Sequence, residues 1–200
     1  MPQKSLLCLG DSYTIGEGVA IHESFPYQLL QLLRNKGFDF HAPEIVAKTG
    51  WTTFELSDHL SQTILHQHYD FVTLLIGVNN QYRNLPVEDY KTDFQFLLEK
   101  AISLANEQPD KVIVLSIPDW SATPFAEGRD RQLIANEIDA FNMVNEEISK
   151  ASQVHYINIT PGTREALGNE SLLAADKLHP SDIEYKRWAE QVKSIIANVL

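Results

Sequence analysis

Short apolar runs alternate along this chain with longer stretches in which hydrophobic residues recur at helical spacing. The runs have the length of buried strands, and the longer stretches have the periodicity of amphipathic helices. The pattern predicts strands at residues 5–9, within 40–47, and at 71–76, 111–117 and 154–159. It predicts helices at 26–35, 53–66, 89–105, 129–151 and 181–199, the last with Ser181 as its N-cap.

The order of these elements predicts the fold class. Strand and helix alternate about five times, which is typical of a parallel sheet with helices on both faces. We therefore expect an α/β fold, a three-layer α/β/α sandwich with a central, mostly five-stranded parallel sheet. No repeat or linker divides the 200 residues, so we expect one domain spanning residues 1–200. Ligands of such sheets bind beyond the carboxyl ends of the strands.

The charge balance narrows the class of partner. The chain has 16 Lys and Arg against 27 Asp and Glu, which gives a net charge of −11. This surplus argues against nucleic acid, whose phosphates require a basic face, and against an anionic membrane surface. No apolar stretch approaches the length of a membrane span, so no stable membrane insertion is expected. The first residues do not resemble a signal peptide, which predicts a cytoplasmic location for a full-length chain.

Residues that hold metals or cofactors are not clustered in the sequence. The single cysteine, Cys8, lies in an apolar run and can form no internal disulfide. The seven histidines are scattered, without His-Glu-x-x-His or paired-cysteine spacing. The sequence therefore predicts no metal site and no cofactor, and it leaves the oligomeric state open.

Polar residues follow the predicted strands at three places. Ser12 comes directly after the first strand in a glycine-rich turn, and Asn79 follows the third strand. His179 precedes the last helix, with Asp176 three residues earlier. These loops meet at one edge of a parallel sheet, so we expect the side chains to lie close together. A serine becomes a nucleophile when a histidine takes its proton and a carboxylate orients that histidine, so the pattern predicts a serine hydrolase.

The motifs around these residues resemble those of the GDSL/SGNH hydrolase family in order and spacing across the whole chain. The matching blocks are residues 10–18 (GDSYTIGEG), residue 50 (G), residues 77–80 (GVNN) and residues 176–180 (DKLHP). Two positions depart from the family pattern: Tyr13 stands where the family has Leu, and Asn80 stands where it has Asp. The position of Asn80 is generally not an oxyanion donor, so we expect catalysis to survive this departure.

The resemblance implies a flavodoxin-like sheet of the SGNH hydrolase type and a role for each residue. Ser12 is the expected nucleophile, His179 its base, and Asp176 the group that orients the imidazole. The backbone N–H groups of Ser12 and Gly50 and the side-chain amide of Asn79 are expected to form the oxyanion hole.

Aromatic residues in the loops at the same edge are candidates for a substrate pocket. They are Tyr13, Trp51, Tyr82, Trp120 and Phe125. The long connection at 118–131 contains Pro, Gly and aromatics, a composition typical of a lid or pocket wall. We also expect Asp11 to brace the serine turn by accepting backbone N–H groups.

The sequence therefore predicts an enzyme that hydrolyses small-molecule carboxylic esters through an acyl-Ser12 intermediate. A short-chain acyl esterase or a lysophospholipase-like lipase is the first interpretation. A carbohydrate O-acetyl esterase and a thioesterase are alternatives that the sequence does not separate. The competing class is a binding protein that has kept this fold without the activity, and the retention of nucleophile, base and oxyanion residues favours the enzyme.

Overall fold

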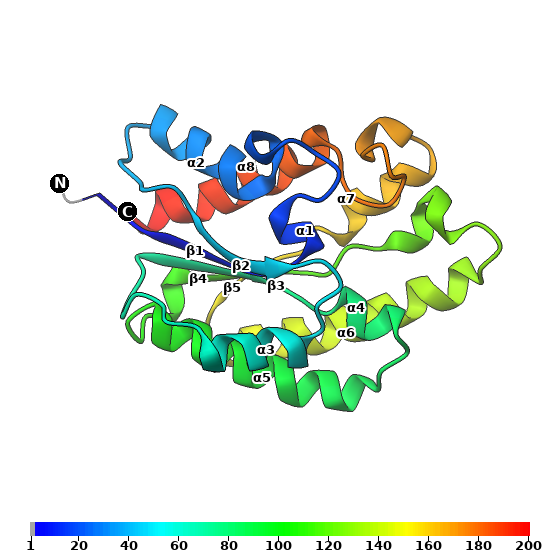
Figure 1. Ribbon diagram of the computed structural model, residues 1–200, viewed down its shortest axis with the longest axis horizontal. Helices are drawn as coiled ribbons and strands as arrows, with labels where there is room; N and C mark the ends of the chain where they lie inside the picture. The colour runs from blue at the N-terminus through cyan, green and yellow to red at the C-terminus, as the bar shows by residue number, and fades with distance from the viewer. Residues whose placement is uncertain (1–2) are drawn as a thin grey trace.

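A five-stranded parallel sheet forms the middle layer of the fold (Figure 1). The computed structural model describes residues 3–200. The strands are β1 (Leu6–Asp11), β2 (Glu44–Lys48), β3 (Phe71–Leu75), β4 (Val112–Leu115) and β5 (His155–Ile157). They lie in the order β2-β1-β3-β4-β5, and each neighbouring pair is parallel. This is the order of a doubly wound, flavodoxin-like sheet, and it confirms the predicted fold class.

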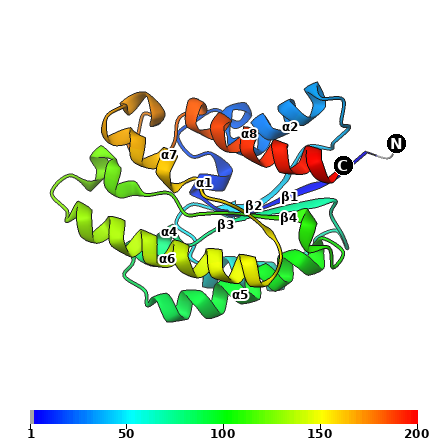
Figure 2. The ribbon, with the colours of Figure 1, turned by 180° about the vertical axis from the view of Figure 1, so that it is seen from behind.

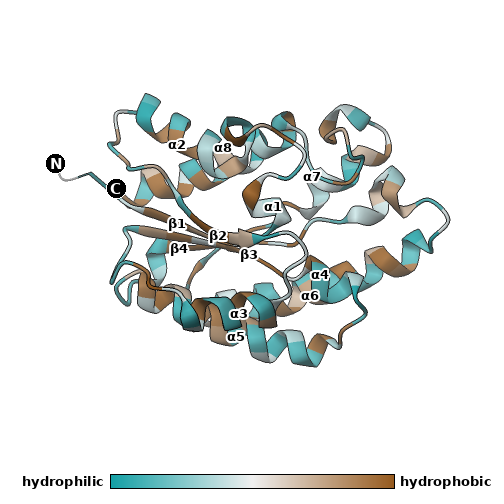
Figure 3. Cartoon of the chain, viewed as in Figure 1, coloured by the Kyte–Doolittle hydropathy of each residue, from teal (hydrophilic) through white to brown (hydrophobic). Residues whose placement is uncertain are grey.

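The three central strands are buried along their whole length, which explains their continuous apolar sequences. In their register Leu9 pairs with Leu74, and Leu74 pairs with Val114. The edge strands β2 and β5 are only partly buried. Hydrophobic colour is accordingly concentrated in the sheet, while the helices carry both hydrophobic and polar residues (Figure 3).

Helices cover both faces of the sheet. The α-helices are α1 (Ser12–Ile15), α2 (Phe25–Asn35), α3 (Thr53–Gln62), α4 (Val78–Tyr82), α5 (Val87–Leu104), α6 (Arg131–Ala151), α7 (Thr160–Arg164) and α8 (Asp182–Val199). Single 3₁₀ turns are η1 (Ile21–Glu23), η2 (Pro109–Lys111), η3 (Trp120–Ala122), η4 (Pro124–Ala126), η5 (Glu165–Leu167) and η6 (Glu170–Leu172). Helices α2 and α8 pack on one face, and α3, α5 and α6 pack on the other (Figures 1 and 2). Within residues 3–200, no helix combines the length and apolarity needed to cross a membrane.

Helix α3 is shorter than its apolar spacing predicts. It ends at Gln62 rather than at residue 66, because Thr63 adopts an extended backbone. The Thr63 hydroxyl donates to the carbonyl of His59 and so satisfies one of the free carbonyls at the helix end. Ile64, which helical spacing places on the buried face, is 99% exposed.

The loop before α8 is held by contacts that differ from the expected helix cap. Ser181 occupies the N-cap position, but its side chain does not cap the helix; its hydroxyl donates to the carbonyl of Ser171. The backbone N–H of Ser181 donates to Leu172, and the backbone N–H of Ala174 donates to the carbonyl of His179. The hydroxyl therefore fastens this loop to η6 instead of stabilising the helix end.

The turn from β1 into α1 is organised by Asp11, as predicted. Its Oδ1 accepts the backbone N–H of Tyr13 at 3.0 Å and so caps the single turn of α1, which begins at Ser12. The Asp11 side chain is completely buried. This burial raises the pKa of Asp11 to about 7, although the hydrogen bond from Tyr13 favours the charged form.

The turn from β3 into α4 requires a glycine. Gly77 has a φ of +133°, a conformation that residues with a Cβ rarely adopt. A Cβ at Gly77 would also lie 2.5 Å from Cε2 of Tyr90, a fully buried residue of α5. The turn places Asn79 in the first turn of α4, at the carboxyl edge of the sheet.

Replacing Gly77 by Ala should destabilise the protein, because the substitution combines an unfavourable φ with a clash against a packed ring. We expect a loss of roughly 2–4 kcal/mol in the free energy of unfolding, measured by urea denaturation. Gly168→Ala is the matched control, since nothing lies within 4 Å of a Cβ at that position. A Gly77→Ala variant as stable as the control would refute this account of the turn.

The Asp11 carboxyl should make stability depend on pH. An unfolded aspartic acid has a pKa of about 3.9, so between that value and about 7 the folded state binds more protons than the unfolded state. The contribution of Asp11 to stability should therefore fall as the pH rises through this window. Relative to Asp11→Asn, the wild-type protein should lose on the order of a few kcal/mol between pH 4 and pH 8. A constant difference across these pH values in urea denaturation would show that Asp11 does not titrate in this way.

Candidate active site

Side chains from opposite ends of the chain form a hydrogen-bonded row at the carboxyl edge of the sheet. Ser12 begins α1, and His179 and Asp176 lie in the loop before α8. Oγ of Ser12 lies 2.9 Å from Nε2 of His179, and Nδ1 of His179 lies 2.6 Å from Oδ2 of Asp176. A carboxylate can only accept a hydrogen bond, so Nδ1 carries the ring proton and Nε2 accepts from the serine hydroxyl.

Asp176 is held in its charged form by its surroundings. Its Oδ1 accepts the backbone N–H groups of Leu178 and His179, each at 3.0 Å. Partial burial opposes ionisation of Asp176, but the hydrogen bonds from the imidazole and from these two N–H groups outweigh it. The pKa of Asp176 therefore lies below its ordinary value, and the carboxylate can both orient the imidazole and stabilise a positive charge on it.

The imidazole is also positioned by packing. His179 is only 6% exposed, and its ring lies 4.9 Å from the ring of Tyr13, measured between centroids. Gly18 allows the loop that carries Asp176 to approach closely: a Cβ at Gly18 would lie 2.8 Å from Cβ of Ala174 and 3.2 Å from Oδ2 of Asp176. The sequence shows Gly18 as part of the first motif, but it gives no sign that this glycine makes room for the distant carboxylate.

The residues that carry the three candidate oxyanion donors line the cavity beside the serine. The N–H of Ser12 lies at the first position of α1, where no intrahelical acceptor exists. The N–H of Gly50, a residue with φ of +81°, makes no hydrogen bond with other residues of the 3–200 segment. The amide of Asn79 donates to the carbonyl of Trp51 at 3.0 Å, and its Nδ2 lies 3.4 Å from Oδ2 of Asp11. The structure thus places the three residues predicted to supply the donors around one cavity.

This cavity has a volume of about 150 Å³. It is lined by Ser12, Tyr13, Thr49, Gly50, Val78, Asn79, Tyr82, Trp120, Phe125, Leu178 and His179. The rings of Tyr82, Trp120 and Phe125 contact one another, with centroids 5.4–6.2 Å apart. Trp120 is buried, whereas Tyr82 and Phe125 are about two-fifths exposed and form the rim. Four of the five predicted pocket aromatics therefore line the cavity.

The fifth predicted pocket aromatic, Trp51, does not line the cavity. Its indole packs against the ring of His59, with centroids 4.8 Å apart, and it is absent from the cavity lining. Trp51 contributes its carbonyl instead, which accepts the Asn79 amide. Sequence reasoning also missed Thr49, Val78 and Leu178, although each is the immediate neighbour of a predicted site residue.

Asn80 joins the starts of two helices. Its Oδ1 accepts the backbone N–H of Thr53 at 3.0 Å, and its Nδ2 donates to the hydroxyl of Thr53 at 2.8 Å. The Thr53 hydroxyl in turn donates to Asp93. An amide can donate and accept at once, whereas an ionised carboxylate only accepts, so Asn80 suits this arrangement better than the Asp that is common in the family.

The buried cysteine and the residue types that bind metals are further candidate sources of chemistry outside this cavity. Cys8 is buried within β1, and this burial raises the pKa of its thiol to about 12, so the thiol stays protonated. Across residues 3–200, no cluster of three or more His, Cys, Asp or Glu side chains is arranged to hold a metal ion.

Comparison with solved structures identifies proteins of similar fold. A lipase/acylhydrolase from Enterococcus faecalis is 20% identical, with a TM-score of 0.79 and coverage of 99% of this chain and 97% of that one. The esterase EstA from Pseudoalteromonas sp. is 18% identical, with a TM-score of 0.73 and coverage of 98% of both chains. Axe2, an acetylxylan esterase from Geobacillus stearothermophilus, is 17% identical, with a TM-score of 0.75 and coverage of 96% and 94%. At identities of 17–20%, these similarities show that the fold is shared and no more than that.

Comparison of the sequence with family models shows which family the chain belongs to. A comparison with curated proteins found no match. The model of the GDSL-like Lipase/Acylhydrolase family, however, matches residues 8–187, which include the serine turn and the loop that carries His179. The chain therefore belongs to the GDSL-like lipase/acylhydrolase family of carboxylic ester hydrolases.

Proposed function

We propose that the protein hydrolyses small carboxylic esters through an acyl-enzyme intermediate on Ser12. The observation that carries this proposal is the hydrogen-bonded row of Ser12, His179 and Asp176. Ser12 and His179 line a cavity that Gly50 and Asn79, the residues of the other candidate oxyanion donors, also line. Family membership supports the reaction class, and the geometry supports the assignment of roles.

In the first half of the reaction, Oγ of Ser12 attacks the ester carbonyl carbon while its proton passes to Nε2 of His179. The distance of 2.9 Å between these atoms is suitable for direct proton transfer. Asp176 stabilises the resulting imidazolium through the hydrogen bond to Nδ1. His179 then gives this proton to the leaving alcohol oxygen as the tetrahedral intermediate collapses to acyl-Ser12.

In the second half, water attacks the acyl carbon while His179 accepts one of its protons. The new tetrahedral intermediate collapses, the proton returns to Oγ of Ser12, and the carboxylic acid leaves. Both intermediates place negative charge on the former carbonyl oxygen. The N–H groups of Ser12 and Gly50 and the amide of Asn79 are proposed to stabilise that charge, because all three border the same cavity.

The cavity favours a small substrate group. Its volume of about 150 Å³ is comparable to a protein cavity that holds one benzene molecule, and Tyr13, Tyr82, Trp120 and Phe125 form part of its wall. This favours a short-chain acyl ester over a long-chain lipid. An O-acetylated carbohydrate is the second candidate. The partly exposed rings of Tyr82 and Phe125 offer aromatic surface beside the pocket, and a structural neighbour is an acetylxylan esterase.

Ser12→Ala should lower kcat for 4-nitrophenyl acetate by on the order of 10³-fold or more, because among residues 3–200 no other hydroxyl is hydrogen-bonded to the His179 ring. Ser194→Ala, on the exposed face of α8, is the matched control and should keep wild-type kcat. A purified, folded Ser12→Ala protein with wild-type turnover would refute the assignment of the nucleophile.

Asn79→Ala should lower kcat by roughly 10²–10³-fold, the usual loss for one oxyanion donor. Asn136→Ala on the exposed part of α6 controls for the loss of an amide elsewhere. If Asn79→Ala raises KM and leaves kcat intact, Asn79 binds the ground state and is not an oxyanion donor.

A further inference from the structure

A second, smaller cavity shares a wall with the catalytic pocket. Its volume is about 10 Å³, enough for one water molecule at most. Its lining includes Pro118, Ala166, Leu172, Leu173 and Pro180. Tyr13, Trp120 and Leu178 line both cavities, so these three residues separate one from the other; we call them the partition.

Two members of the partition are fixed by the same contacts that build the catalytic row. The backbone N–H of Tyr13 donates to Asp11, and its ring packs on His179. The backbone N–H of Leu178 donates to Oδ1 of Asp176. The backbone positions of both residues are therefore set by the turns that hold the proposed nucleophile and base, and the Tyr13 ring is also held by its packing on His179.

The third member, Trp120, is fixed by a chain of side-chain hydrogen bonds. Its Nε1 donates to Oε1 of Gln81 at 2.7 Å, and Nε2 of Gln81 donates to Oε2 of Glu137 at 2.8 Å. Trp120 is only 3% exposed. The indole is thereby tied to α4 through Gln81 and to α6 through Glu137.

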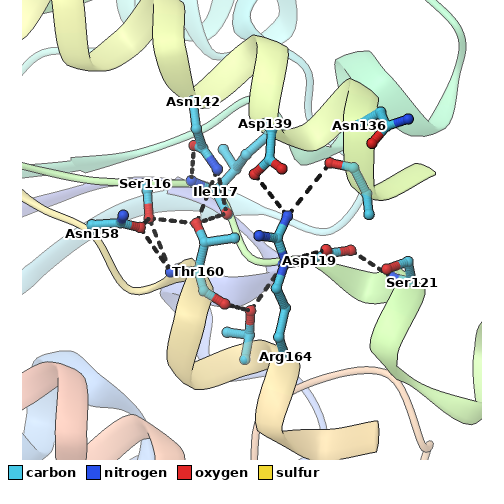
Figure 4. Close-up of polar contacts among 12 residues, drawn as sticks. Ser116, Ile117, Asp119, Ser121, Asn136, Asp139, Asn142, Asn158, Thr160 and Arg164 are labelled. Carbon is cyan, nitrogen blue, oxygen red and sulfur yellow. Dashed lines mark hydrogen bonds and ion pairs between the residues drawn. The ribbon is translucent and has the colours of Figure 1, made fainter. Parts of the chain in front are cut away.

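The backbone next to Trp120 is also held by hydrogen bonds, which involve Asp119 and Arg164 (Figure 4). Asp119 is buried; its Oδ1 accepts the backbone N–H of Ser121, and its Oδ2 accepts Nε of Arg164 at 2.7 Å. The same guanidinium donates to Asp139 of α6 at 2.7 Å. The turn η3 is thus joined to both α6 and α7, so the partition behaves as a fixed wall.

We propose that this partition sets the length of the apolar arm of the ester that the catalytic pocket accepts, with Tyr13 as the specificity-determining residue. This inference rests on the proposed ester hydrolysis and adds an upper limit on the length of the substrate's apolar arm. A pocket of about 150 Å³ holds a group on the order of six carbon atoms, and the phenol of Tyr13 closes it on the side of the second cavity.

Replacing Tyr13 by Leu removes the ring while keeping an apolar residue, and it opens the pocket towards the second cavity. A longer chain can then bury more of its methylenes. Each additional buried methylene raises affinity about fourfold, so two of them raise it by on the order of tenfold. The gain should be confined to chains that are too long for the wild-type pocket.

The test uses two ester series, so that it covers both arms of the substrate. Values of kcat/KM are measured for 4-nitrophenyl esters from acetate to decanoate and for alkyl acetates from methyl to octyl. In Tyr13→Leu, the ratio of long-chain to shortest-chain kcat/KM should rise at least tenfold in one series, and that series identifies the arm that meets the partition. The ratio is unaffected by a uniform loss of activity from weaker packing on His179.

Leu178→Ala opens the partition without altering Tyr13 and should raise the same ratio; it also decides the question if Tyr13→Leu fails to fold. Tyr27→Leu is the matched control, since Tyr27 lies on α2 and lines neither cavity. Ratios within twofold of wild type in both series, for folded variants that still hydrolyse acetate, would overturn the proposal. A wild-type protein inactive on every ester would instead overturn the proposed function.

Discussion

A 2.9 Å hydrogen bond between residues 167 positions apart in the sequence is the contact on which the proposed chemistry depends. Ser12 is held by the end of β1 and by the Asp11 cap, whereas His179 is held by Asp176 and by backbone pairing of its loop with residues 172–174. Proton transfer over such a distance tolerates little misplacement, because an error of about 1 Å can cost 10²-fold in rate. Much of the polar network at this edge can be understood as fixing these two loops relative to each other.

The parallel sheet explains how one edge collects all the parts. Each strand delivers its following loop to the same side, so neighbouring strands supply different components. The loop after β1 carries Ser12, the loop after β2 carries Gly50, the turn after β3 carries Asn79, and the connection after β4 carries Trp120. The segment after β5 contributes α7, whose Arg164 anchors that connection through the buried Asp119. The residues proposed as nucleophile, oxyanion donors and pocket wall thus follow successive strands of the sheet.

The sequence predicts the fold and the convergence of Ser12, Asp176 and His179, because both follow from periodicity and from the rule that places loops at one sheet edge. It does not predict where loop side chains point. Trp51 turns to His59 instead of the pocket, and the Ser181 hydroxyl bonds to Ser171 instead of capping α8. Both outcomes depend on contacts between loop and helix residues that hydrophobic periodicity does not predict. The sequence does not predict the partition either, because its three residues come together only when the loops fold.

The most direct test of the central claim is covalent labelling of the intact protein with a fluorophosphonate. A nucleophilic serine displaces fluoride from phosphorus and forms a stable adduct that resembles the tetrahedral intermediate. Intact-mass measurement followed by peptide mapping should show one adduct per chain, on Ser12, with ester hydrolysis lost in proportion to labelling. An adduct on another residue, or full hydrolytic activity in protein labelled at Ser12, would contradict the account.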